Sequence, residues 1–203
     1  MRAFTTLTAA ACPLPFQGID TDQLIPARFM KRTREQGYGD ALLHDQRFDA
    51  AGSPAPGHPL NQARWAGAAI LVARRNFGAG SSREAAVYAL ADHGIRCVLA
   101  PSFGDIFAAN AVNNGLLPGQ VAEAAAERLL QALQDGLGAL TVDLQACQVR
   151  AGAETFPLAI DAVFRTKLLN GWDDLDLTAS YAAELAAFTA NDAALRPWMP
   201  PGG

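Results

Sequence analysis

The sequence predicts an α/β protein organised around a βαβ unit at about residues 69–100. The first observation is a continuous apolar run, Ala69–Ala73, which is typical of a strand that is buried on both faces. The second is a glycine-rich segment after this run, followed by a helical stretch to about His93 and another apolar run at Ile95–Ala100. A strand, a helix and a strand in this order predict two parallel strands joined by a right-handed crossover.

The residues before this unit predict one strand, two connections and a short helix. Residues 1–16 form the strand, which ends in a turn at Pro13 and Pro15 because proline favours turns over strand interiors. The other segments are a structured loop at 20–34, a short helix at 37–48 and a surface connection rich in Gly, Ser and Pro at 52–57.

The residues after the unit predict four helices, one strand and a tail. The clearest helix, at 120–135, has apolar side chains on one face at Val121, Ala125, Leu129 and Leu133. The other elements are helices at 103–114, 159–169 and 175–190, an alternating strand at Ala139–Leu144 and a tail at Arg196–Gly203.

Composition limits the class of protein. The chain has 203 residues, enough for one domain or at most two, and its 50% apolar and 18% charged residues exclude a disordered, coiled-coil or collagen-like chain. A formal charge of −4 gives no electrostatic attraction for nucleic acid. The longest apolar run, Trp65–Ala73, is far shorter than the roughly 20 residues of a membrane-spanning helix. We therefore expect neither a nucleic acid nor a membrane as partner.

The cysteines do not form a recognisable site. Cys12, Cys97 and Cys147 are far apart and none belongs to a CxxC motif, so we expect no metal site and no disulfide framework. The alanines before Cys12 resemble a lipoprotein cleavage site, but the apolar stretch before them is too short and too polar for a signal peptide. A cytoplasmic location is the resulting expectation.

The glycine-rich segment Asn76–Ser82 leads into a predicted helix start. Ser81 and Glu84 have the spacing of a capping box, and a helix start presents unpaired N–H groups that can bind an anion. Arg83 adds a cation that can bind a carboxylate through two hydrogen bonds. Arg83 also occupies the place of the third glycine of a dinucleotide-binding motif, and no P-loop lysine follows. A capped helix without any ligand explains the same residues.

A second candidate site is the segment Asp20–Pro26 with the cations that follow it. Asp20 and Asp22 could bind magnesium, but the glycine and threonine that phosphoryl-transfer enzymes need downstream are missing. Helix caps or Asx-turns are the alternative that we favour for these aspartates. The cations form either a solvated charge run or a loop that binds an acidic substrate or partner. They are Arg28, Lys31, Arg32 and Arg34.

Several segments, in this order and at this spacing, carry a resemblance to a known family. They are Asp20–Pro26, Asn76–Glu84, Ala100–Phe103 with Asp105–Phe107, Asn114–Pro118, and Leu168–Gly171 with Asp173 and Asp174. Together they resemble the small subunits of 3-isopropylmalate dehydratase, in the aconitase superfamily, over nearly the whole chain. The resemblance implies a single swivelling β/β/α domain over residues 1–203 with a C-terminal helical extension at about 159–195.

The resemblance also implies an activity and the residues for it. The reaction is a reversible dehydration of 2-isopropylmalate to 2-isopropylmaleate and a rehydration to 3-isopropylmalate, in leucine biosynthesis. Ser81 is the implied catalytic base. The implied substrate ligands are Ser82, Arg83, Arg28, Phe29, Met30 and Lys31, of which Phe29–Lys31 contact the third substituent of the substrate. Asp20, Asp22, Gly78, Gly80 and Glu84 are implied as structural residues of the motifs.

The resemblance places the 4Fe–4S cluster of the reaction on a separate large subunit. We therefore expect this chain to bind no cofactor, to act only with that subunit and to share a small dicarboxylate substrate with it. The family usually has cysteine and histidine where this chain has Ala79 and Ala85. A related hydro-lyase that acts on citramalate or dimethylmalate is thus an alternative, and a nucleotide-binding domain or a noncatalytic interaction module are alternatives from other classes.

Overall fold

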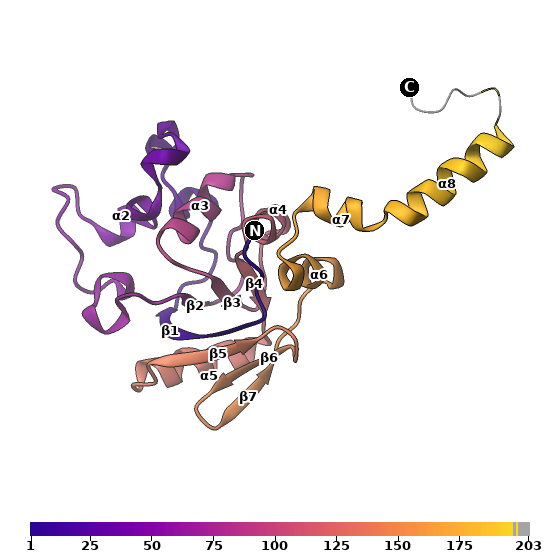
Figure 1. Cartoon of the computed structure of the whole chain (residues 1–203). Coiled ribbons are helices and arrows are strands. Elements are labelled where there is room, and N and C mark those ends of the chain that lie inside the picture. The colour runs from indigo at the N-terminus through magenta and orange to yellow at the C-terminus, as the bar shows by residue number, and fades with distance from the viewer. Residues whose placement is uncertain (197, 199–203) are drawn as a thin grey trace.

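The computed structural model describes residues 1–196 and 198 and confirms an α/β fold around a curled seven-stranded sheet (Figure 1). The strand order is β4-β3-β2-β1-β5-β6-β7. The strands are β1 (Thr6–Leu14), β2 (Ile70–Ala73), β3 (Cys97–Ala100), β4 (Leu117–Gln120), β5 (Ala139–Asp143), β6 (Gln148–Ala151) and β7 (Glu154–Pro157). The predicted βαβ unit is present as two neighbouring parallel strands, β2 and β3, with a helix between them in sequence.

Strand β1 joins the two halves of the sheet. Its residues 6–10 pair antiparallel with β5, and its residues 11–14 pair parallel with β2. Strands β1 to β4 are therefore parallel, whereas β5, β6 and β7 form an antiparallel meander. A further bridge between Gln120, at the end of β4, and Ala159, just after β7, brings the two edges of the sheet together. This bridge is why the sheet is curled rather than open.

Helices cover both faces of the parallel strands. Figure 1 shows α3 and α4 on one side and α5 on the other, where α5 packs against β1, β2 and β3. Ala125, Leu129 and Leu133 of α5 are buried, as their spacing predicts. The helices are α1 (Thr21–Leu24), α2 (His44–Arg47), α3 (Glu84–Asp92), α4 (Asp105–Asn113), α5 (Glu123–Gln134), α6 (Ala162–Asn170), α7 (Asp174–Ser180) and α8 (Ala182–Leu195). None of these described helices is long and apolar enough to cross a membrane.

The core lies between the parallel strands and these helices. Every residue of β2 and β3 is buried, which confirms that an uninterrupted apolar run marks a strand covered on both faces. The core continues past the ends of the strands through three aromatic rings. Phe77 meets Phe107 edge-on at 5.4 Å between ring centres, and Phe103 stacks on Phe107 at 6.3 Å. This aromatic group supports the loops that follow β2 and β3.

The N-terminal residues hold α6 against the body of the protein. The Met1 amino group donates to the Gly171 carbonyl at 2.9 Å, and the Phe4 N–H donates to the Leu168 carbonyl at 2.8 Å. Phe4 and Leu168 are both buried. Helix α6 therefore belongs to the packed body, whereas α7 and α8 lead away from it (Figure 1).

Three strands have no signal in the sequence analysis. Strand β4 contains Pro118 and Gly119, which normally argue against a strand, but β4 is an edge strand and an edge tolerates a missing N–H donor. A Cβ on Gly119 would lie 2.7 Å from a methyl group of Leu158, so glycine lets the segment after β7 approach β4. Strands β6 and β7 have four residues each, too few for a clear alternating pattern.

Three predicted elements differ from the structure. The helix predicted at 37–48 is present only as a 3₁₀ turn at Gly39–Ala41 and the short α2. The helix predicted at 175–190 is two helices that are separated at Tyr181. The turn predicted at Pro13 is absent because Pro13 lies within β1, where it is paired with Val72. The predicted tail, Arg196–Gly203, lies mostly outside the described residues.

Candidate active site

The carboxyl ends of β1, β2 and β3 meet at one edge of the sheet, the usual position of a ligand site in open α/β sheets. Backbone hydrogen bonds join the loops that follow β1 and β2. The Gly78 N–H donates to the Ile19 carbonyl at 2.7 Å, and the Thr21 N–H donates to the Ala79 carbonyl at 3.0 Å. The Thr21 hydroxyl donates to the Ser81 carbonyl at 2.8 Å. The two motifs of the sequence analysis therefore form one structural unit.

Glycine is required where the loop after β2 meets the loop after β3. Gly78 has a φ of +71°, and a Cβ at this position would overlap the ring of Phe107. A Cβ on Gly104 would lie 2.5 Å from the Gly78 carbonyl oxygen. The two loops are thus packed backbone to backbone over a buried aromatic ring, which fixes the position of the residues between them.

A cavity of about 180 Å³ opens between these loops. It is lined by Thr21, Gly78, Gly80, Ser81, Arg83, Gly104, Asp105, Ile106 and Phe107. The structure thus brings the predicted base, the predicted carboxylate ligand and two predicted structural glycines to one place. Ser81 itself is exposed, so its hydroxyl is accessible to a small molecule.

Arg83 is the cation of this cavity. Its side chain is only 18% exposed and forms an ion pair with Asp22, which is 56% exposed. Nη1 of Arg83, a buried nitrogen, makes the contact with Asp22 and has no other partner among the described residues. The guanidinium is therefore held in place by charge at one nitrogen, and its planar set of donors suits the binding of a carboxylate.

The predicted capping box of Ser81 and Glu84 is wrong. Helix α3 begins at Glu84, its N-cap is Arg83, and no side chain caps it. The hydrogen bond from Thr21 to the Ser81 carbonyl ties Ser81 to α1 instead of to α3. Glu84 accepts a hydrogen bond from the Asn114 amide at 3.1 Å and so links α3 to the end of α4.

The aspartates of the first motif have structural partners. Asp20 caps α1, because the Gln23 N–H donates to its carboxylate at 2.7 Å and the Gln23 side chain accepts from the Asp20 N–H at 3.1 Å. Asp22 is paired with Arg83. Within the described residues, no group of three or more His, Cys, Asp or Glu side chains is placed to hold a metal ion. The capping interpretation of Asp20 is therefore confirmed.

The cations after Pro26 are not a free basic patch. Three of the four form ion pairs with aspartates: Arg28 with Asp45, Arg32 with Asp40 and Arg34 with Asp92. Each pairing holds the aspartate pKa below its usual value, in Asp92 against the opposing effect of burial. The pairs fasten this segment to α2 and α3. Three of the four cations are therefore neutralised within the chain.

The predicted alkyl-reading residues lie outside the cavity. Ala27–Lys31 is a 3₁₀ helix, and the ring of Phe29 lies between the guanidinium groups of Arg28 and Arg32, at 4.6 and 4.7 Å. Met30 is 43% exposed. Arg28, Phe29, Met30 and Lys31 do not line the space between Ser81 and Arg83.

The thiols do not fit a 4Fe–4S cluster. Burial raises the pKa of Cys12 to about 12 and also raises the pKa of Cys97, so neither thiol ionises readily into a cluster ligand. Cys147 is half-buried, and its thiol contacts the Leu144 carbonyl. The residues that the structure describes therefore offer no ligand set for such a cluster.

Sequence reasoning does not identify the whole cavity wall. It gives no separate role to Thr21, whose hydroxyl positions the Ser81 backbone, or to Gly104–Phe107. The sequence does contain a signal for Gly104–Phe107, because this loop follows a predicted parallel strand and the loops after neighbouring parallel strands meet at one edge of a sheet.

The structure also places the remaining residues named in the sequence analysis. Ser82 is exposed beside Ser81, while Ala79 and Ala85 are half-buried.

Comparisons with known proteins find relatives over nearly the whole chain. Residues 1–124 match the Aconitase C-terminal domain family. A 3-isopropylmalate dehydratase small subunit from Rhodospirillum centenum is 44% identical over 98% of this chain and 98% of its own length. Its counterpart from Shewanella denitrificans is 46% identical over 94% of this chain and 97% of its own length. A crystal structure of 3-isopropylmalate dehydratase from Methanocaldococcus jannaschii has the same fold, with a TM-score of 0.62, 23% identity and coverage of 90% of this chain and 98% of that chain.

Proposed function

Because the chain belongs to the family of 3-isopropylmalate dehydratase small subunits, within the aconitase superfamily, we propose that it works with a large subunit to isomerise 2-isopropylmalate to 3-isopropylmalate. The intermediate is 2-isopropylmaleate, and the reaction is a step of leucine biosynthesis. The observation that carries the proposal is the cavity that joins Ser81 and Arg83 to the two family motifs. We include a cytoplasmic location in the proposal.

The reaction requires a base beside a carboxylate-bearing carbon. In the dehydration, a base takes the proton from a C–H bond next to a carboxylate, and the electron pair of that bond forms the C=C bond. The hydroxyl of the neighbouring carbon leaves as hydroxide with the electron pair of its C–O bond, so the removed proton and the hydroxide together amount to one water. In the rehydration, the hydroxyl is added to the carbon that lost the hydrogen, and the hydrogen is added to the carbon that lost the hydroxyl. The proposal gives the proton transfer to Ser81, acting as an alkoxide. A serine anion needs electrostatic stabilisation, which the nearby guanidinium of Arg83 can provide.

Arg83 binds a substrate carboxylate in this proposal. A carboxylate offers two acceptor oxygens to the planar guanidinium, whereas Asp22 now contacts one terminal nitrogen. Ser82, exposed beside Ser81, is the second polar contact. Because Phe29–Lys31 and Arg28 do not line the cavity, they contact the substrate only after the large subunit has closed over both regions.

The proposal assigns the 4Fe–4S cluster to the large subunit, since the described residues of this chain offer no ligands for it. A cluster of this kind supplies a Lewis-acid iron for a departing hydroxyl. The small subunit contributes the base, the carboxylate ligand and a packed wall of backbone and apolar side chains. The cavity of about 180 Å³ is also smaller than the roughly 300–1,000 Å³ of common ligand pockets, which disfavours a dinucleotide.

Reconstitution tests this function. The chain is mixed anaerobically with the cognate large subunit carrying an intact cluster, and kcat/KM is measured for 2-isopropylmalate, citramalate and 2,3-dimethylmalate. We expect the highest value for 2-isopropylmalate and no turnover by either subunit alone. A higher value for citramalate or dimethylmalate would assign the chain to a related hydro-lyase. No turnover of any of the three, or tight binding of a nicotinamide cofactor, would overturn the proposal.

A further inference from the structure

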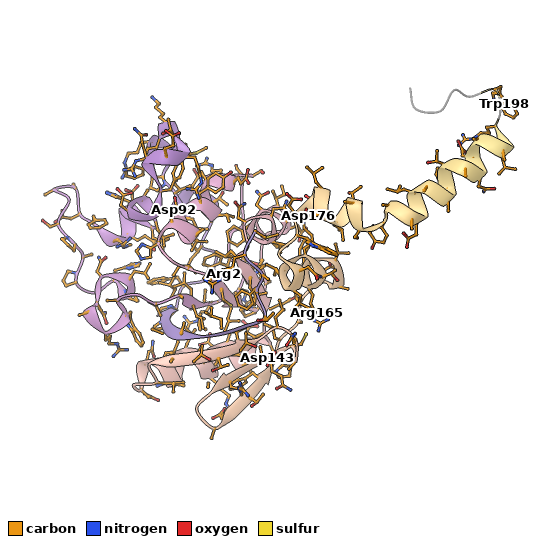
Figure 2. The ribbon with its side chains drawn as sticks, in the orientation of Figure 1. Arg2, Asp92, Asp143, Arg165, Asp176 and Trp198 are labelled. Atoms are coloured by element: carbon orange, nitrogen blue, oxygen red, sulfur yellow. The ribbon has the colours of Figure 1, made fainter. Side chains whose placement is uncertain are left out.

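The C-terminal helices form an arm that leaves the body of the protein. We define the arm as α7 and α8, residues 174–195. Figure 1 shows α8 extending away from the sheet and the other helices, and Figure 2 places Trp198 at the outer end of this extension and Asp176 near its base. Apart from the half-buried Asp192, every residue of α8 is exposed.

Helix α8 is apolar around most of its circumference. Leu185, Phe188 and Leu195 recur at spacings of three and seven residues and so lie on one side, which Asp192 shares and which begins at the N-cap residue Tyr181, and alanines fill most of the opposite side. Phe188 is 64% exposed. A helix that is apolar all round is normally buried, and an isolated helix of about 14 residues is only marginally stable in water. The arm therefore has the composition of a segment that packs against another surface.

The base of the arm is fixed to α4 by a buried lysine. Lys167 is 3% exposed, and its ammonium donates to the carboxylate of Asp174 at 2.6 Å and to the side chain of Asn113. The Asn113 amide donates to the same carboxylate at 3.0 Å. This contact ties the start of α7 to the last turn of α4. The first turn of α4, with Ile106, lines the cavity of Ser81. The arm and the cavity are thus connected through one rigid helix of nine residues.

Exposed apolar side chains also connect the cavity to the arm. Large exposed apolar residues occur on α4 at Ile106, on α6 at Val163 and on α7 at Leu175, before the row on α8 begins. Helix α4 contacts α6, and Asn113 of α4 contacts α7, so these helices are neighbours. A partner that covers the Ser81 cavity at the first turn of α4 can therefore also reach the base of the arm, where Asn113 contacts Asp174.

The charge of the arm favours a different chain over a second copy. The carboxylates of Asp176 and Glu184 have no ion pair in the described part of the chain. The one cation at the outer end of α8, Arg196, is already paired with Asp192. Two arms packed together would bring like charges close, whereas an apolar surface with a basic rim complements the arm.

We propose that the α7–α8 arm is a docking element for the large subunit, which binds it through an apolar surface rimmed by basic side chains. This inference rests on the proposed function, because that function requires a large subunit over the Ser81 cavity. Phe188 and Leu185 are the central anchors of the contact, since large apolar side chains at the centre of an interface carry most of its binding energy.

The test measures the dissociation constant of the complex between the full chain and the cognate large subunit. The variant is Leu185→Ala with Phe188→Ala, which keeps good helix formers in α8. Gln148→Ala on β6 is the control, because Gln148 is exposed and belongs neither to the arm nor to the lining of the Ser81 cavity. We expect the double variant to raise the dissociation constant at least about 10-fold. The control should leave it within about 2-fold, and the thermal midpoint of the isolated chain should stay unchanged in both.

The outcomes separate this inference from the proposed function. With enough large subunit to saturate the double variant, turnover should return to the wild-type level, because the Ser81 cavity is intact. If the wild-type complex forms and is active but the double variant binds equally well, the docking inference is wrong and the proposed function stands. If the wild-type chain alone is a dimer that the double variant dissociates, the arm binds a second copy and the inference is overturned. If the wild-type chain does not bind the large subunit at all, the proposed function fails first.

Discussion

Arg83 and Asp22 show at the scale of single residues how the site is prepared for an anion. Asp22 neutralises the guanidinium of Arg83 and keeps it at the cavity wall, but Asp22 itself is more than half exposed. Because Asp22 is the exposed partner and contacts one nitrogen of the guanidinium, a substrate carboxylate with two oxygens can approach Arg83 from the same side and replace Asp22. The ion pair with Asp22 therefore positions Arg83 and still leaves its guanidinium accessible to a substrate carboxylate.

Met30 offers a clean test of substrate selection. Its side chain is 43% exposed, so Met30→Arg should leave the fold intact. In our proposal, Met30 meets the alkyl group of the substrate, and an arginine there would favour a carboxylate instead. We expect kcat/KM for 2-isopropylmalate to fall about 10-fold or more, on the scale of 1–3 kcal/mol for an apolar pocket contact. Steady-state kinetics of the complex measure this fall in kcat/KM. An equal fall in kcat/KM for carboxyl-bearing and alkyl-bearing substrates would instead indicate an effect on subunit docking or on folding.

The sequence identifies candidate residues but not all of their partners. Ser81, Arg83, Gly78 and Gly80 are predicted from the motifs and are brought together by the fold. The capping role of Ser81 is wrong, because the pattern cannot show that Thr21, distant in sequence, holds the Ser81 backbone. The ion pairs of Arg28, Arg32 and Arg34 could not be predicted for the same reason, since their aspartate partners come from other segments.

At the scale of elements, the contact between the glycine-rich loop and α4 is the tightest part of the site. A side chain at Gly78 would meet the ring of Phe107 and would also occupy a φ of +71°. We expect Gly78→Ala to lower stability by roughly 2–5 kcal/mol, from backbone strain of about 1–2 and overpacking of about 1–3 kcal/mol. Gly18→Ala is the control, because Gly18 has a similar φ of +66° and a Cβ there would have no atom within 4 Å. Equal destabilisation of both variants in urea unfolding would show that the clash contributes nothing.

The ion pair between Arg34 and Asp92 links the 3₁₀ helix Arg34–Gln36 to α3 and makes this contact sensitive to acid. Burial opposes ionisation of Asp92, but Arg34 and the Tyr38 N–H together lower its pKa below the usual value. A lowered pKa in the folded state means that the ionised carboxylate stabilises the fold above about pH 4. This stabilisation is lost as the pH falls through the lowered value. We expect wild type to lose more unfolding free energy between pH 6 and pH 3 than Asp92→Asn does; parallel pH profiles would contradict this.

The sequence predicts whether a segment is a helix or a strand where its hydrophobic pattern is long. It does not predict a strand that is defined only by its hydrogen bonds to a neighbouring strand. The buried runs of β2 and β3 and the amphipathic α5 follow directly from periodicity. Strand β4 could not be predicted, because Pro118 and Gly119 are acceptable only at the edge of a sheet. Its edge position depends on the order of all seven strands, which is a property of the whole fold.

At the scale of the whole molecule, we propose that the chain supplies one side of an active site that it shares with a large subunit. The curled sheet gathers three loops into the Ser81 cavity, while the thiols of the described residues are not placed to bind a cluster. We propose that residues 1–203 act as one swivel domain whose helical extension, about 159–195, ends in the docking arm. The sequence predicts this extension as helical, but it cannot show that α6 packs on the body while α8 leaves it.

The central claim is that this chain supplies the base of a site shared between two subunits. The most direct measurement is the anaerobic turnover of 2-isopropylmalate by the complex of the large subunit with Ser81→Ala, at saturating large subunit. Because a lost general base costs at least about 100-fold, we expect kcat to fall by that factor with little change in KM. Ser53→Ala, in the exposed surface connection, should keep wild-type turnover. Near wild-type kcat for the Ser81→Ala complex would contradict the claim.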